Sequence, residues 1–154
     1  MLELHAIATK KEHGDGRFAV AMTAQENKRF LTGIQTKPGE YYSMLGRVNA
    51  EMSDCSRASD RESIFEGIRR SVGFARLNRM VFGVMEGWMV EQLRRQAEAS
   101  TAAGDTDGAL NWNEVLATIL GCQGRHDEAL VLLEAILKFR QRTQSCNNPD
   151  LGAT

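Results

Sequence analysis

Two apolar runs of helical length, joined by the short polar link Gln123-Gly124-Arg125, constrain the fold of this chain most. The first run begins near Gly108, and the second opens with Asp127-Glu128-Ala129. In both runs small and large apolar residues recur at fixed offsets, a pattern typical of α-helices that pack on a partner. Because a short link containing glycine reverses the chain direction, the sequence predicts an antiparallel helical hairpin over 105–154.

The expected contact between these two helices combines small and large side chains. The residues predicted to form this packing site are Leu116, Ala117, Leu120, Gly124, Ala129 and Leu133. The two alanines matter most, because a small side chain at a helix crossing lets the two backbones approach closely. Leu132, Ile136 and Phe139 are expected on an open face of the second helix, through which the chain would self-associate.

Composition excludes several classes of function. The chain has 154 residues, 42% of them hydrophobic and 25% charged, which is ordinary for a globular protein. With 19 basic and 20 acidic residues, no overall field attracts nucleic acid or a membrane surface. The three cysteines show no Cys-x-x-Cys spacing, and the histidines are scattered, so neither disulfides nor a metal site is expected. We expect a cytoplasmic protein without a cofactor.

The first 58 residues predict a small α/β segment. We expect a short helix over Leu2–Lys11, a strand over Arg17–Met22 and a second strand over Arg47–Met52. Thr23 and Glu26 have the spacing of a capping box, so a helix should run from Thr23 to about Thr32. The glycines and the proline in Gly33–Tyr42 predict a loop. Because two strands form a marginal sheet, this segment looks like a remnant.

Residues 59–104 are expected to form helices that cap the hairpin. Ser59 and Glu62 suggest a second capping box, and Ser71-Val72-Gly73 should break or bend that helix. A long helix should then run from Phe74 to Ala103. Its predicted buried seam is Leu77, Val81, Val84 and Trp88, widened by Met85, Met89 and Leu93. A soft docking face formed by Met80, Met85, Trp88 and Met89 is the alternative interpretation.

The C-terminal hairpin resembles the 42-residue tetratricopeptide (TPR) repeat of kinesin light chains and related arrays. The resemblance rests on Leu116-Ala117, on Gln123-Gly124-Arg125-His126-Asp127-Glu128-Ala129 and on Phe139-Arg140. Asn148–Thr154 looks like the opening of a second copy, with Asp150 lying 42 residues after Gly108. The resemblance implies a mainly α fold and a scaffold that binds a protein or peptide, not an enzyme. It also implies that the chain is part of a larger repeat array.

The first helix departs from this family at one position that bears on binding. The family's Leu-Asn-Asn-Leu-Ala is replaced by Asn113-Glu114-Val115-Leu116-Ala117, so the asparagines that clamp a peptide backbone in the family are absent. The residues expected to line any remaining groove are Asn111, Glu114 and Thr118.

Upstream segments suggest another class of function. Phe18–Met22, Ser59–Phe65 and Arg69–Val81 resemble a segment that closes a TIR-like α/β domain ahead of TPR arrays in protist proteins. The resemblance implies an alternative function, as half of an NAD-hydrolysing domain in which Glu3 would carry the catalytic role. A truncated gene product without independent function is the third interpretation.

Overall fold

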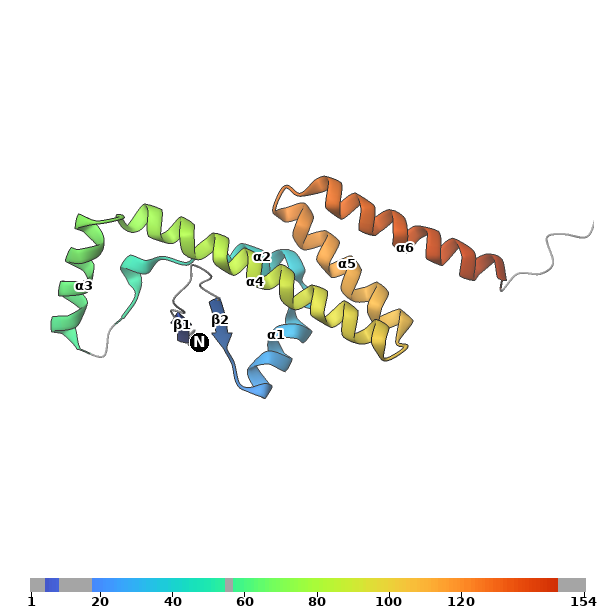
Figure 1. The fold of residues 1–154 in the computed structure, drawn as a ribbon, viewed down its shortest axis with the longest axis horizontal. Helices are drawn as coiled ribbons and strands as arrows, with labels where there is room; N and C mark the ends of the chain where they lie inside the picture. Colours follow the sequence, from blue (N-terminus) through green and yellow to red (C-terminus); the bar gives the residue numbers. More distant parts are fainter. Residues whose placement is uncertain (1–4, 9–17, 55–56, 147–154) are drawn as a thin grey trace, which may run out of the picture.

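The chain forms a mainly helical structure, seen here in a computed structural model that describes residues 5–8, 18–54 and 57–146. The elements in chain order are β1 (His5–Ala8), β2 (Phe18–Ala21), α1 (Ala24–Thr36), α2 (Pro38–Leu45), the short 3-10 helix η1 (Ala50–Met52), α3 (Ala58–Arg70), α4 (Phe74–Ala102), α5 (Thr106–Cys122) and α6 (His126–Cys146). The expected mainly α class is therefore confirmed. Figure 1 shows the long helix α4 with α5 folding back beside it, and α6 running beside α5.

Two turns of the same geometry connect α4, α5 and α6. Gly104 and Gly124 have φ angles of 73° and 75°, in the left-handed region that favours glycine. After each glycine, the next backbone N–H donates to the carbonyl five residues earlier, Asp105 to Ser100 and Arg125 to Leu120, both at 2.9 Å. Each turn reverses the chain, so the three helices form successive antiparallel pairs (Figure 1).

Helix α5 lies at the centre of the hydrophobic core. It packs against α4 and α6, and it also contacts α1 and α2. Leu93 of α4 and Ile119 of α5 are fully buried, and Leu120 is only 1% exposed. The N-terminal helices, α4 and the hairpin therefore share one continuous core.

The N-terminal helices are longer than the sequence predicts. The capping box forms as expected, with the Glu26 N–H donating to Thr23 Oγ1 at 3.2 Å, but α1 extends to Thr36. The predicted loop over Gly33–Tyr42 is wrong, because Pro38 occupies the first turn of α2. Proline is tolerated there since its missing N–H would have no intrahelical acceptor.

The strands also differ from expectation. His5–Ala8 is paired with β2 in antiparallel register, Ile7 opposite Ala19, where a helix was predicted. β2 lies within the range where a strand was expected. The second predicted strand, Arg47–Met52, is wrong: Ala50–Met52 forms a 3-10 turn. The Ala50 N–H donates to Asn78 Oδ1 of α4 at 2.8 Å. The backbone here is therefore held by a side chain of α4 and not by the carbonyl of a neighbouring strand.

Helix α3 begins one residue before its predicted cap. Its N-cap is Arg57, which makes no side-chain capping bond, so the capping box predicted at Ser59 and Glu62 is wrong. Phe65 of α3 packs edge-on against Phe74 of α4 with ring centroids 5.1 Å apart, and Arg61 stacks over Phe65 at 4.7 Å. This small cluster fixes the α3–α4 junction.

Helix α4 spans nearly all of its predicted range and buries most of its predicted seam. Val84 of the predicted seam is 42% exposed, whereas Met85, Met89 and Leu93 are buried. Trp88 packs on Phe30 of α1, with ring centroids 5.2 Å apart. Val81 and Trp88 are partly buried against the core, so Val84 is the member of the predicted seam that lies at the surface instead, because α5 approaches α4 along the Met85–Leu93 line. Met80 is 55% exposed, so the four residues of the alternative docking face divide between core and surface.

Candidate functional site

One narrow strip of α5 stays at the surface of the helical stack. Asn111, Glu114 and Thr118, the three residues predicted to line a groove, lie together on this strip because they are three and four residues apart. Asn111 and Thr118 are exposed and Glu114 is half-buried. The rest of α5 faces the core through the buried residues Ala109, Trp112, Val115, Leu116, Ala117, Ile119 and Leu120.

Two polar contacts hold Glu114 in this strip. Its carboxylate lies 2.6 Å from Nη2 of Arg140 on α6, and its backbone carbonyl accepts a bond from Thr118 Oγ1 at 3.0 Å. The sequence did not indicate the Arg140 contact, because the two residues are on different helices. The strip therefore offers the amide of Asn111 and the hydroxyl of Thr118, while the charge of Glu114 is already compensated.

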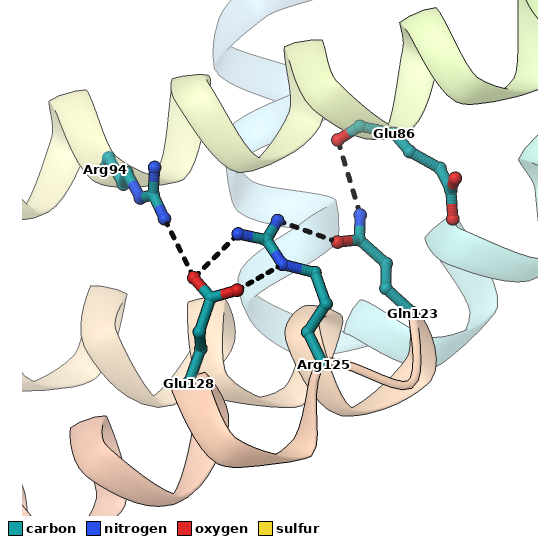
Figure 2. Close-up of polar contacts among 5 residues, drawn as sticks. All are labelled: Glu86, Arg94, Gln123, Arg125 and Glu128. Atoms are coloured by element: carbon teal, nitrogen blue, oxygen red, sulfur yellow. Dashed lines mark hydrogen bonds and ion pairs between the residues drawn. The ribbon is translucent and has the colours of Figure 1, made fainter.

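A polar network closes the other end of the hairpin (Figure 2). Arg125 donates to both carboxylate oxygens of Glu128, at 2.6 and 2.7 Å, and Arg94 of α4 approaches the same carboxylate at 3.5 Å. Gln123 Nε2 donates to the backbone carbonyl of Glu86 at 3.4 Å, and its Oε1 accepts from Arg125 at 3.3 Å. The network links the α5–α6 turn to α4, so it orients α6 relative to α4.

The electrostatics of this network follow from these contacts. The hydrogen bonds from Arg125 lower the pKa of Glu128, and the charge of Arg94 acts in the same direction. The same hydrogen bonds raise the pKa of Arg125. Sequence reasoning treated Gln123-Gly124-Arg125 as a turn only. The opposite charges of Arg125 and Glu128 at three-residue spacing were the signal that could have revealed the pair.

The residues predicted to pack the hairpin lie at the contact between α5 and α6 or in its turn, with one exception. Leu116, Ala117, Leu120 and Ala129 are all buried, and Gly124 adopts the left-handed turn conformation. Leu133 is 48% exposed, so its predicted packing role is wrong. On α6 the buried side runs through Ala129, Leu132 and Ile136, because this is the line of the helix that meets α5.

That correction also changes the open face of α6. Leu132 packs against the core and Ile136 is buried, so neither is left in water as predicted, whereas Phe139 is 40% exposed. Apolar residues that do reach the surface of α6 include Leu130, Val131, Leu133 and Leu137. α6 is thus apolar well beyond the side that α5 covers.

The described residues form hollows on the surface, but no set of metal-binding side chains gathers among these residues. A hollow of about 730 Å³ lies between α4 and the β2–α1 junction, with Trp88, Glu91 and Arg95 in its wall. A second hollow of about 440 Å³ lies where α4, α5 and α6 meet. Within residues 5–8, 18–54 and 57–146, no group of three His, Cys, Asp or Glu side chains is placed to hold a metal ion.

Two sequence hypotheses fall outside the described residues. Glu3, the residue of the NAD-hydrolase alternative, is one, and the opening of a second repeat at Asn148–Thr154 is the other. In the described part of the chain, no helix combines the length and apolar character needed to cross a membrane. Comparison with family descriptions, with curated proteins and with solved structures finds no match to this chain.

Proposed function

We propose that this chain is a protein-binding helical module of the TPR type, with the strip Asn111, Glu114 and Thr118 on α5 as its contact surface. The observation that carries the proposal is the position of α5, which is enclosed by α1, α2, α4 and α6 and reaches the surface along this strip. A surface of this kind is rigidly positioned, because every other side of the same helix is fixed in the core.

The repeated geometry of the two turns supports the same proposal. Gly104 and Gly124 are 20 residues apart and use the same left-handed glycine and the same backbone hydrogen bond. Repeat proteins are built in this way, because each helix pair buries its apolar face against the next. α4 then serves as the preceding helix of the stack and α5–α6 as one hairpin.

The chemistry of the strip indicates what kind of partner it takes. Asn111 offers an amide that both donates and accepts hydrogen bonds, and Thr118 offers a hydroxyl. The strip lacks a net uncompensated charge because Arg140 pairs with Glu114. We therefore expect an extended peptide segment of a protein partner, held through its backbone amides, in place of a nucleic acid or a membrane surface.

A displayed library of random peptides, selected on the purified chain, tests this proposal. Thr118→Arg should abolish binding of the enriched peptides by filling the strip with a long charged side chain. Thr143→Arg is the matched control, because Thr143 is also an exposed helical threonine whose hydroxyl donates to the carbonyl four residues earlier. Peptides that bind both variants equally, or a selection that enriches none, would refute the assignment of this surface.

A further inference from the structure

The outer side of α6 carries a stripe of three exposed leucines. Leu130, Leu133 and Leu137 are 57%, 48% and 56% exposed, and their three- and four-residue spacing aligns them along the helix. Because successive residues turn by about 100°, this leucine stripe lies about 100° around α6 from the side that packs on α5. No described element covers it.

The charges of α6 are divided between its two halves. His126–Leu133 contains two acidic residues and no lysine or arginine, whereas Glu134–Cys146 contains one acidic and three basic residues. Two copies of α6 lying side by side in parallel would place like charges together. Glu128 and Arg140 are already paired with Arg125 and Glu114 of the same copy, which leaves Asp127 in the first half and Lys138 and Arg142 in the second to face a partner. In antiparallel orientation each Asp127 faces the basic half of the other copy, so the helix is complementary to itself.

We propose that the leucine stripe is the interface of a homodimer in which two copies of α6 pack antiparallel about a twofold axis. Leu130 of one copy then lies opposite Leu137 of the other, and Leu133 lies next to the axis. An interface of this kind uses the same patch on both copies, which the charge division of α6 satisfies. The inference rests on the proposed function in treating the stack as an interaction module, and it names a second copy of the chain as one partner.

Asp127 and Lys138 set the register of this dimer. They are 11 residues apart, close to three full turns, so they lie on the same side of α6. The midpoint of this pair falls within about one residue, or ~1.5 Å, of the midpoint of Leu130 and Leu137. The antiparallel arrangement that pairs the leucines therefore also places Asp127 of each copy level with Lys138 of the other, on the same flank of the interface. Lys138 lies 3.8 Å from Glu134 of its own helix, an exposed pair that leaves it accessible to a second carboxylate.

Sedimentation velocity of the full chain over a range of concentrations tests the interface. The wild-type mass should rise with concentration toward twice 17.1 kDa. Leu133→Glu and Leu137→Glu should each remain monomeric, because a carboxylate would be buried between two apolar stripes. Val131→Glu is the matched control: Val131 is 68% exposed and lies on another side of the same helix, so this variant should still dimerise. Circular dichroism of each variant verifies that the helices are retained.

Charge reversal tests the orientation. Asp127→Lys and Lys138→Asp should each weaken the dimer about tenfold, because each places like charges together twice per dimer. The double variant Asp127→Lys/Lys138→Asp restores opposite charges and should dimerise as the wild type does. In a parallel pair neither single reversal would have this effect. Each of the two residues would lie opposite the identical residue of the other copy, so like charges would face one another both before and after the reversal.

Several outcomes would overturn the dimer. A wild-type chain that stays monomeric at the highest concentration is one, and a dimer that survives Leu133→Glu is another. Equal loss on Val131→Glu would place the interface elsewhere, and failure of the double reversal would exclude the antiparallel register. The peptide selection with Thr118→Arg is independent of these results. A wild-type chain that dimerises but enriches no peptide would contradict only the proposed function, and a wild-type chain that binds peptides but stays monomeric would contradict only the dimer.

Discussion

Glu114 of α5 and Arg140 of α6 form an ion pair across the helical hairpin, with 2.6 Å between Oε1 and Nη2. The two side chains are 37% and 54% exposed, and pairs this exposed contribute roughly 0–1 kcal/mol to stability. The pair neutralises the one charged member of the candidate strip and leaves a partner the Asn111 amide and the acceptor side of the Thr118 hydroxyl, whose proton goes to the Glu114 carbonyl.

The contact between α5 and α6 depends on small side chains. Ala117 and Ala129 are 3% and 7% exposed and belong to the same core cluster. Ala117→Leu and Ala129→Leu should each lower the free energy of unfolding by about 1–3 kcal/mol, because three additional carbons must fit between packed helices. Urea denaturation followed by circular dichroism measures the change.

The matched control for these variants is Ala135→Leu on the exposed part of α6, which should change stability by no more than about 0.5 kcal/mol. Ala117→Leu and Ala129→Leu chains as stable as the wild type would show that the two helices do not approach closely at these positions.

Two glycines three residues apart, Gly121 in the last turn of α5 and Gly124 in the α5–α6 turn, should respond to alanine substitution in opposite directions. Gly124 has a φ of +75°, so Gly124→Ala should destabilise the chain by about 1–2 kcal/mol. Gly121 is helical, and a Cβ there would meet no atom within 4 Å. Gly121→Ala should therefore stabilise the chain by about 0.5–1 kcal/mol through its higher helix propensity. Thermal denaturation of both variants measures the difference, and equal shifts in Tm would contradict the turn geometry.

The hairpin could be predicted because its signals are local. The turn at Gly124, the small residues at Ala117 and Ala129 and the apolar runs on either side all lie within a short stretch. The candidate strip could be predicted for the same reason, since a spacing of three and four residues places Asn111, Glu114 and Thr118 on one side of a helix.

The buried side of a helix depends on contacts that are distant in the sequence. On α4, Met85 and Met89 are buried in the core that α4 shares with α5 and Val84 lies at the surface, although all three residues fit a helical seam. On α6 both Leu132 and Leu133 are apolar, and only the direction from which α5 approaches decides between them. The Arg140 partner of Glu114 could not be predicted because periodicity within one helix says nothing about a second one.

The packing of Ile119 at the centre of the stack predicts a large cost for its truncation. Ile119 is fully buried between the helices that surround α5. Ile119→Ala should destabilise the chain by about 2–5 kcal/mol, since it removes apolar contacts and leaves a cavity. Ile64→Ala is the control with the same chemistry: Ile64 of α3 is 51% exposed, so the change should be about 1 kcal/mol or less. Chemical denaturation of the two variants tests whether the stability of the fold depends on the packing around α5. Comparable losses of unfolding free energy in Ile119→Ala and Ile64→Ala would contradict this.

Tyr42 should make stability depend on pH in the alkaline range. The Tyr42 hydroxyl donates to the carboxylate of Glu86, which joins α2 to α4. Burial raises the pKa of Tyr42 to about 12, and the hydrogen bond to Glu86 adds to the effect. The folded pKa therefore lies above the ordinary value of 10.0, so the stabilisation is complete below pH 10.0 and is lost as the pH rises toward 12. The ultraviolet absorbance of tyrosinate should show one phenol that ionises near pH 12.

The matched variant for this prediction is Tyr42→Phe, which keeps the ring against Phe82 but removes the ionisable hydroxyl. It should be less stable than the wild type at pH 8, and the difference should shrink as the pH rises through 10 and beyond, because the wild type alone loses the Glu86 contact on ionisation. Urea denaturation of both chains at several alkaline pH values measures this difference. A constant difference between the two chains across that range would mean that Tyr42 ionises equally easily in the folded and unfolded states, and the α2–α4 hydrogen bond would then not be the source of the pH dependence.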